Sequence, residues 1–234
     1  MSQAIIVAHG SPSNPDEQQE ALRALARAVG ALVPEWDVRG ATLAAGDALG
    51  EALRGLDRPL VYPFFMAAGW FTGKELPRRI AALGAEVRQM VPFGLEPELP
   101  RLIAEATTKA ALDAGLEPAE SGLLLAAHGS RTARRSKDSS YAMAENLTRL
   151  TGFGRIAVGL IEEPPLLADT AREIGRGVCL PFFALHAGHV TDDVPQALRA
   201  AGFEGPCLPP VGEHPGVPAL IAAALRRAAT HAAG

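Results

Sequence analysis

The sequence predicts an α/β fold built from two similar halves, and three observations lead to this prediction. The segment IIVAHGS at 5–11 returns as LLAAHGS at 124–130, and PFF at 63–65 returns at 181–183. The two repeats have nearly the same offset, 119 residues (128 − 9) and 118 residues (181 − 63). Short β-like runs alternate with amphipathic helical runs in each half, as in a parallel sheet with helical crossovers. We therefore expect two α/β/α halves, each with a four-stranded parallel sheet, facing each other across a cleft.

The first half, residues 1–117, opens with QAIIVAH at 3–9, whose composition is that of a buried strand. A helix is expected to follow, with Asn14 as its N-cap and Pro15 in its first turn. Acidic residues next to this start complement the helix N-terminus. The remaining runs predict a strand at 36–43, a short helix near 46–55, a strand at 59–65, a helix at 74–83, a strand at 85–93 and a helix at 96–114.

The second half, residues 118–234, repeats this order after a joint at 113–122 that contains Gly, Pro and Ser. Strands are expected near 122–127, 154–160, 176–182 and 205–208. Helices are expected near 137–150, 164–174, 192–201 and 214–231.

Composition excludes several classes of protein. The chain has 234 residues, of which 48% are hydrophobic, so it can bury a sizeable core. A net charge of −4 argues against nucleic acid or a membrane surface as partner. Two cysteines, Cys179 and Cys207, are too few for a disulfide framework or a zinc cluster. No signal peptide or membrane span is visible, so we expect a cytoplasmic protein, a monomer or a homodimer, with reduced thiols.

Titratable side chains of the second half gather where its predicted strands end. His128 follows the first strand, Glu162 and Glu163 follow the second, and His186 and His189 follow the third. Ligands of parallel α/β sheets bind beyond the carboxyl ends of the strands. Two imidazoles and a carboxylate can hold Co²⁺, Fe²⁺, Ni²⁺ or Zn²⁺, and they can accept protons near neutral pH.

The first half keeps the frame of this site, meaning its His-Gly-Ser and PFF segments, but lacks most of its titratable side chains. His9 remains, but alanines occupy the loop after the second strand. In an ungapped match, Ala68 and Phe71 stand opposite His186 and His189, whereas a one-residue gap would set Trp70 opposite His189. Because the shared frame persists without the histidines, we interpret the histidines of the second half as functional.

A basic loop, SRTARRSKDSS at 130–140, follows His128. Guanidinium groups bind carboxylates and phosphates in a bidentate manner, and a helix N-terminus also favours anions. The loop is therefore a candidate anion site, or alternatively an ordinary solvated helix start. Its candidate substrate-binding residues are Ser130, Arg131, Arg134 and Arg135, followed by Lys137.

Structural explanations exist for some of the other residues. The His-Gly-Ser motif, at His9 above all, could be a tight turn with a hydrogen-bonded imidazole. One of Glu162 and Glu163 could be a plain helix cap before Pro164, and His186 could face solvent. The sequence contains no HExxH, GxSxG, P-loop or GxGxxG motif, which leaves metal hydrolysis of that type, hydride transfer and nucleotide hydrolysis without support.

The strand–His-Gly-Ser motif of both halves, with GHVTDDVP at 188–195 after a third strand, resembles the sirohydrochlorin cobaltochelatases and ferrochelatases. These CbiX-like class II chelatases belong to the wider ferrochelatase-like superfamily. The resemblance covers the whole chain as two chelatase-like halves. It implies ATP-independent insertion of Co²⁺ or Fe²⁺ into sirohydrochlorin or a related tetrapyrrole, in cobalamin or siroheme biosynthesis. No permanently bound cofactor is implied, because the metal is a substrate.

By this resemblance, His128 and His189 form the metal-handling and catalytic pair, assisted by Glu162 or Glu163. The basic loop suits the carboxylate-rich tetrapyrrole. The second half would then hold the active site, and the first would be a degenerate lid. The resemblance does not decide between Co²⁺ and Fe²⁺, nor does it identify the exact tetrapyrrole. The alternative to a chelatase is a non-enzymatic protein that carries the metal or the tetrapyrrole. Apolar walls for the macrocycle are expected at Phe64, Phe65, Met66, Trp70, Phe71, Phe182, Phe183 and Leu185.

Overall fold

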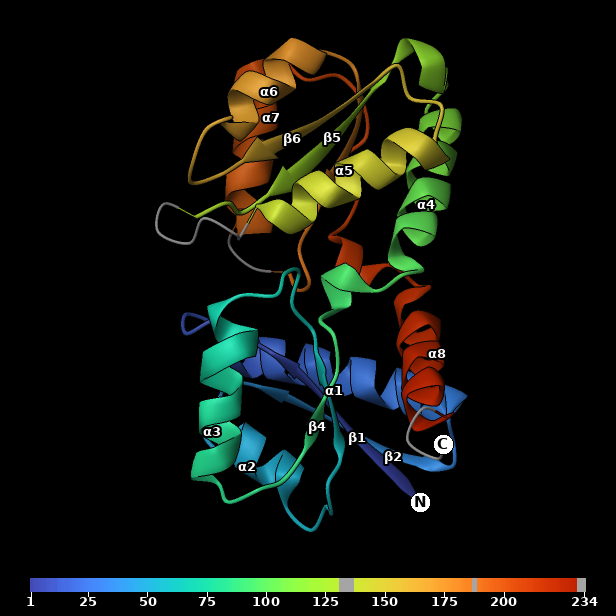
Figure 1. Ribbon diagram of the computed structural model, residues 1–234. Helices are drawn as coiled ribbons and strands as arrows, with labels where there is room; N and C mark the ends of the chain where they lie inside the picture. The colour runs from blue at the N-terminus through green and yellow to red at the C-terminus, as the bar shows by residue number, and fades with distance from the viewer. Residues whose placement is uncertain (131–136, 187–188, 231–234) are drawn as a thin grey trace. The chain divides into compact units, whose positions relative to one another are not determined.

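The computed structural model of the chain describes residues 1–130, 137–186 and 189–230 (Figure 1). The chain divides into two compact units, one made of Met1–Glu96 with Pro215–Gly234 and the other of Pro97–His214. Each unit contains one parallel sheet with helices packed on it, so the predicted α/β fold is confirmed.

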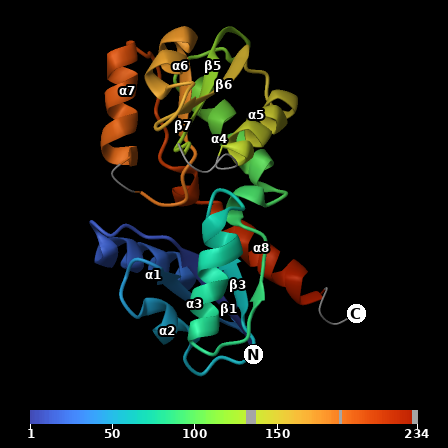
Figure 2. The ribbon, with the colours of Figure 1, turned by 60° about the vertical axis from the view of Figure 1, so that its left-hand side comes forward.

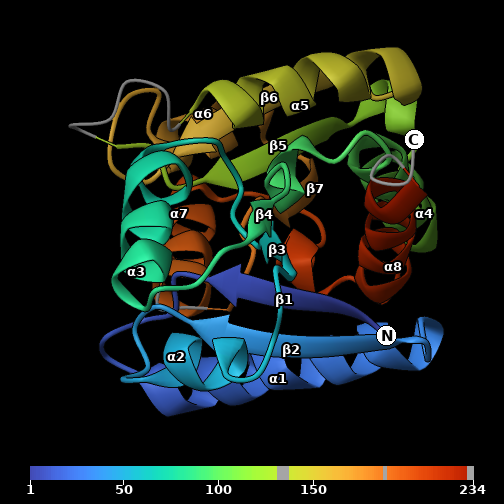
Figure 3. The same ribbon diagram turned by 60° about the horizontal axis from the view of Figure 1, so that its bottom comes forward.

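The first unit has a four-stranded sheet in the order β2-β1-β3-β4. Every pairing in it is parallel, and Ala4 at the centre pairs with Val38 on one side and Leu60 on the other. Figure 3 shows β1 and β2 side by side over α1. The elements are β1 (Ser2–Ala8), α1 (Pro15–Leu32), β2 (Trp36–Thr42), α2 (Ala48–Leu53), β3 (Leu60–Pro63), η1 (Phe71–Glu75), α3 (Leu76–Ala82), β4 (Arg88–Gln89), η2 (Phe93–Leu95) and α8 (Val217–Thr230).

The second unit has a three-stranded parallel sheet in the order β6-β5-β7. Figure 2 shows α6 and α7 on one side of this sheet and α4 and α5 on the other. The elements are α4 (Leu99–Asp113), η3 (Pro118–Glu120), β5 (Gly122–Ala127), α5 (Asp138–Leu150), β6 (Arg155–Leu160), α6 (Leu167–Ile174), β7 (Gly177–Pro181), η4 (His189–Asp193), α7 (Val194–Ala201) and η5 (Val211–Glu213).

The compact units differ from the sequence repeats of 1–117 and 118–234 by an exchange of helices. Helix α8, the last of the second repeat, packs against α1 in the first unit, and α4 of the first repeat packs against α5 in the second. An ion pair of 2.7 Å between Arg227 on α8 and the fully buried carboxylate of Glu96 helps to hold α8 in its unit. A sequence repeat therefore does not by itself define a unit that packs alone.

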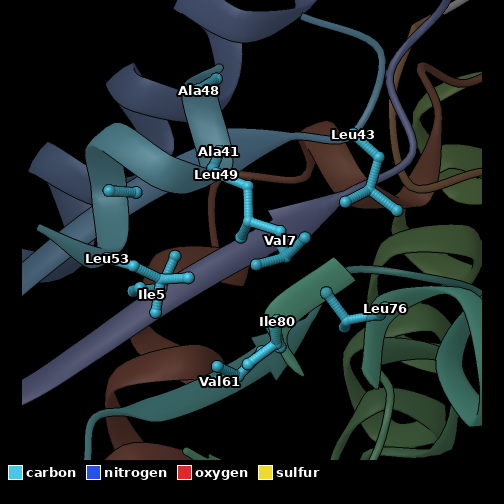
Figure 4. Close-up of a cluster of buried hydrophobic side chains, with 11 residues drawn as sticks. Ile5, Val7, Ala41, Leu43, Ala48, Leu49, Leu53, Val61, Leu76 and Ile80 are labelled. Atoms are coloured by element: carbon cyan, nitrogen blue, oxygen red, sulfur yellow. The ribbon is translucent and has the colours of Figure 1, made fainter. Parts of the chain in front are cut away.

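Each sheet has a separate apolar core. In the first unit, Ile5 and Val7 of β1 lie between α2 and α3, as Figure 4 shows. In the second unit, Leu124 and Ala126 of β5 pack with Cys179 against α6 and α7. Alternate residues of β1 and β5 face opposite sides, and both strands are almost entirely buried, as expected for central strands of a parallel sheet.

Several details differ from the sequence expectations. The strand expected at 85–93 is reduced to the two residues of β4. The strand expected at 205–208 is reduced to isolated bridges, because Pro206 has no N–H to donate to a sheet. The helices after both PFF segments begin earlier than expected, as π-helical turns at Phe71 and His189. Asn14 occupies the N-cap position of α1, but its side chain donates to Glu17 and not to the helix backbone.

Candidate functional site

The His-Gly-Ser turn begins where β5 ends. Gly129 has a φ of +70°, in the region that favours glycine, and an added Cβ would lie 3.0 Å from Glu163 Cγ. His128 is half-buried, and its Nδ1 lies 3.0 Å from the carbonyl oxygen of Gly129. A carbonyl oxygen only accepts, so in this contact the imidazole Nδ1 is the donor.

Glu162 lies beside His128 because the pairing of β5 with β6 continues past both strands. Ile161 N donates to Ala127 O, and Glu162 N donates to His128 O at 3.1 Å. Glu162 Oε2 then lies 4.0 Å from His128 Nδ1, and both side chains are more than 40% exposed. An imidazole and a carboxylate thus meet at the carboxyl edge of the sheet, where solvent and a ligand can reach them.

Glu163 stabilises the turn. Its Oε1 accepts a hydrogen bond of 3.0 Å from Ser130 N, and its Oε2 accepts one of 2.7 Å from Lys137 Nζ. The hydrogen bond from Lys137, helped by the one from Ser130, lowers the pKa of Glu163, and Glu163 raises the pKa of Lys137. The two glutamates therefore have different surroundings, and Lys137, expected in the anion site, is engaged by Glu163.

His186 has an acidic neighbour that the sequence analysis did not identify. Its Nδ1 lies 3.3 Å from a carboxylate oxygen of Glu213 in η5, and both side chains are about half exposed. The repeat could have revealed Glu213: the position 118 residues earlier is Leu95, so this acid, like His186 and His189, has no counterpart in the first half.

Other predicted site residues fall at the edge of what the structure describes. Arg131, Arg134 and Arg135 lie outside the described residues. His189 begins η4, but its side chain is also outside them. Among the side chains that are described, no group of three or more His, Cys, Asp or Glu residues could hold a metal ion.

The first unit repeats the frame of this site closely. Ala44 N donates to His9 O, as Glu162 N donates to His128 O, so Ala44 occupies the place of Glu162. Gly94 N donates to Phe65 O, and Gly212 N donates to Phe183 O, both at 3.0 Å.

The aromatic residues expected to form apolar walls divide into two groups. Phe64 and Phe182 are buried in the cores, so the expectation that they face a ligand is wrong. In the first unit, the ring centroids of His9 and Phe71 are 4.2 Å apart, and those of Trp70 and Phe71 are 5.1 Å apart. Trp70 is 60% exposed, which makes this cluster available to a flat apolar ligand.

A family model, CbiX, matches residues 3–110 and 122–228. The chain belongs to the CbiX family. The resemblance noted in the sequence is thereby confirmed, and the CbiX match in each half also confirms the internal repeat.

Solved structures agree with this CbiX assignment. The chain is 47% identical to CbiX, the terminal enzyme for biosynthesis of siroheme in denitrifying bacteria, over 97% of this chain and 99% of that one, with a TM-score of 0.88. Two further structures share the fold: SirB from Bacillus subtilis with Fe³⁺ (16% identity, 100% and 98% coverage, TM-score 0.78), and DR2241 from Deinococcus radiodurans (24% identity, 96% and 54% coverage, TM-score 0.69). A search of curated proteins gave no match.

The π-helical turns of this CbiX-family chain show how its two PFF loops correspond. The π-helical turns η1 and η4 start at Phe71 and His189, 118 residues apart, which selects the ungapped match of the two loops. Over the described residues, no helix is long and apolar enough to cross a membrane.

Proposed function

We propose that this protein inserts a divalent metal, Co²⁺ or Fe²⁺, into sirohydrochlorin or a related tetrapyrrole without ATP. The observation that carries the proposal is the pair of His128 and Glu162, 4.0 Å apart at the carboxyl edge of a CbiX-type sheet. The relative with 47% identity is itself an enzyme of siroheme biosynthesis. The substrates are the metal ion and the tetrapyrrole, and the chain needs no resident cofactor for this reaction.

His128 and His189 are the proposed metal ligands, and the first unit provides the argument for their pairing. His9 and Phe71 are the repeat counterparts of His128 and His189, and their rings are 4.2 Å apart. The second unit has the same strand ending before position 128 and the same π-helical turn starting at position 189. Two imidazoles in such positions can share one Co²⁺ or Fe²⁺, with Glu162 as a third ligand, and a site with so few protein ligands can still release the metal.

Metal insertion must also remove two pyrrole protons for each divalent ion that enters the macrocycle. Glu162 is the proposed acceptor and relay for these protons, since it is exposed to solvent and lies beside His128. Glu163 supports the turn that carries His128. His186, on the loop after β7, and Glu213, in η5, form a second acid–imidazole pair that can pass protons to water.

Substrate carboxylates are proposed to bind the basic loop through Arg131, Arg134 and Arg135, with Ser130 at its start. Arginine forks match the carboxylates of sirohydrochlorin in geometry and charge. Such contacts would orient the macrocycle without taking part in the proton transfer.

The test is anaerobic metal insertion followed by absorption spectroscopy, with purified protein, sirohydrochlorin and either Co²⁺ or Fe²⁺. We expect insertion well above the spontaneous rate, and a fall to that rate in H128A and H189A. Comparing kcat/KM for the two metals identifies the preferred one. Tight binding of metal or tetrapyrrole with no gain in rate would contradict the enzyme proposal and identify a carrier.

A further inference from the structure

The two cysteines of the chain lie opposite each other on neighbouring parallel segments. Cys179 in β7 and Cys207 form an isolated bridge. Cys179 N donates to Pro206 O, and Leu208 N donates to Cys179 O, both at 2.9 Å, so the two cysteines are in register. Residues in register on parallel strands project their side chains to the same face of the sheet.

The spacing of such a pair suits a disulfide. Neighbouring strands lie about 4.8 Å apart, and disulfides join residues whose Cα atoms are roughly 4.4–6.8 Å apart. The segment that carries Cys207 pairs with β7 through isolated bridges at the edge of the sheet and not as a full strand, so a small shift can bring the sulfur atoms together.

The surroundings of the two thiols differ. Cys179 is fully buried in the core beneath α6 and α7, whereas Cys207 is exposed. The neighbouring Cys207 thiol, together with burial, raises the pKa of Cys179, and the Cys179 thiol lowers the pKa of Cys207. The exposed thiol is therefore the better nucleophile, and the buried thiol is positioned to react with it.

We propose that Cys179 and Cys207 form a reversible intramolecular disulfide, with Cys207 as the thiol that reacts with a peroxide. The Cys207 thiolate attacks a peroxide oxygen and breaks the O–O bond, which gives a sulfenic acid and releases water after one proton is taken up. The Cys179 sulfur then attacks the Cys207 sulfur, loses its proton and releases a second water. Two thiols are oxidised and one peroxide is reduced to two waters, and a small thiol reverses the step by exchange.

The disulfide would act close to the loop that carries His186. Strand β7 ends at Pro181, two residues before Phe183, and the segment after Cys207 leads to Gly212. Gly212 N donates to Phe183 O at 3.0 Å, and an added Cβ at Gly212 would lie 1.8 Å from Ala184 O. The two segments are thus in close contact beyond the cysteines, so a covalent link between them would restrain both ends of this stretch.

Peroxide titration of the purified full chain tests the proposal. The wild type is expected to lose both free thiols. Its intact mass should fall by the mass of two hydrogens, and it should run as a monomer on a non-reducing gel. Trypsin should then give peptides 177–199 and 200–226 as one linked species that a reductant separates.

Two variants serve as controls. C207S should keep the thiol of Cys179 at the same peroxide dose, because the buried thiol does not meet the oxidant. C179A should oxidise Cys207 to the sulfinic acid and beyond, because no resolving thiol remains; if this variant does not fold, the peptide map and C207S decide. Persistence of both wild-type thiols, oxygen addition at Cys207 alone, or a disulfide-linked dimer would each overturn the proposal.

Discussion

Replacing Gly129 by alanine tests whether Glu163 fixes the turn that carries His128. An alanine at this position has two costs. Its positive φ of +70° costs about 1 kcal/mol for a residue with a Cβ. The new Cβ would also lie 3.0 Å from Glu163 Cγ and 3.2 Å from Leu160 Cβ, and such overpacking costs roughly 1–3 kcal/mol. Glu163 is held by Ser130 and Lys137, so it cannot move away without losing hydrogen bonds.

The matched control is Gly202, which follows α7 in the same unit. Its φ of +64° is also left-handed, but an added Cβ would meet nothing within 4 Å. G202A should therefore cost only the backbone term, about 1 kcal/mol, whereas G129A should cost about 3 kcal/mol. At about 3 °C per kcal/mol for a chain of this size, calorimetry should show melting temperatures lower by about 3 °C and about 9 °C. Equal losses in the two variants would refute the clamp, because the conformational cost alone would then explain both.

Two more predictions concern the carboxylates. E162Q should slow metal insertion by about 100-fold at an unchanged melting temperature, because it removes a solvent-exposed acid beside His128. E163Q should mainly lower the melting temperature. Initial rates and calorimetry that show the opposite pattern would exchange the two roles. R227M should destabilise the fold by about 2 kcal/mol at neutral pH, below the cost for a fully buried pair, because the Arg227 side chain is 45% exposed. Burial raises the pKa of Glu96 above its usual 4.5, and Arg227 opposes that rise. Without Arg227 the pKa of Glu96 in the folded protein is higher, so R227M loses more free energy of unfolding than the wild type as the pH rises past 4.5. In urea titrations the free energies of unfolding of R227M and wild type should therefore converge towards pH 4, and a difference independent of pH would contradict this explanation.

The order of strands and helices was predictable because burial and periodicity are local properties of the sequence. The alternation of strand and helix patterns also predicted that Glu162 and Glu163 would follow the second strand of their half, at the same edge of the sheet as His128. The different roles of these glutamates were not predictable, since they depend on which one meets Ser130 and Lys137 across the turn. Position along the chain cannot distinguish neighbours that point in different directions.

Long-range packing accounts for most of the other differences. The exchange of α4 and α8 depends on contacts between segments far apart in sequence, such as Arg227 with Glu96. Phe64 was expected to face a ligand, but it packs on Phe93 with ring centroids 4.6 Å apart, a contact that the PFF pattern does not reveal.

The central claim is that the second half carries the chemistry and the first keeps only its frame. The most direct measurement compares the initial rate of anaerobic metal insertion in H128A and in H9A, its repeat counterpart. The account predicts that H128A falls to the spontaneous rate, while H9A keeps at least about one tenth of the wild-type rate, a loss of at most roughly 1.4 kcal/mol. An H9A variant at the spontaneous rate, with H128A near wild type, would contradict the account and place the reaction in the first half.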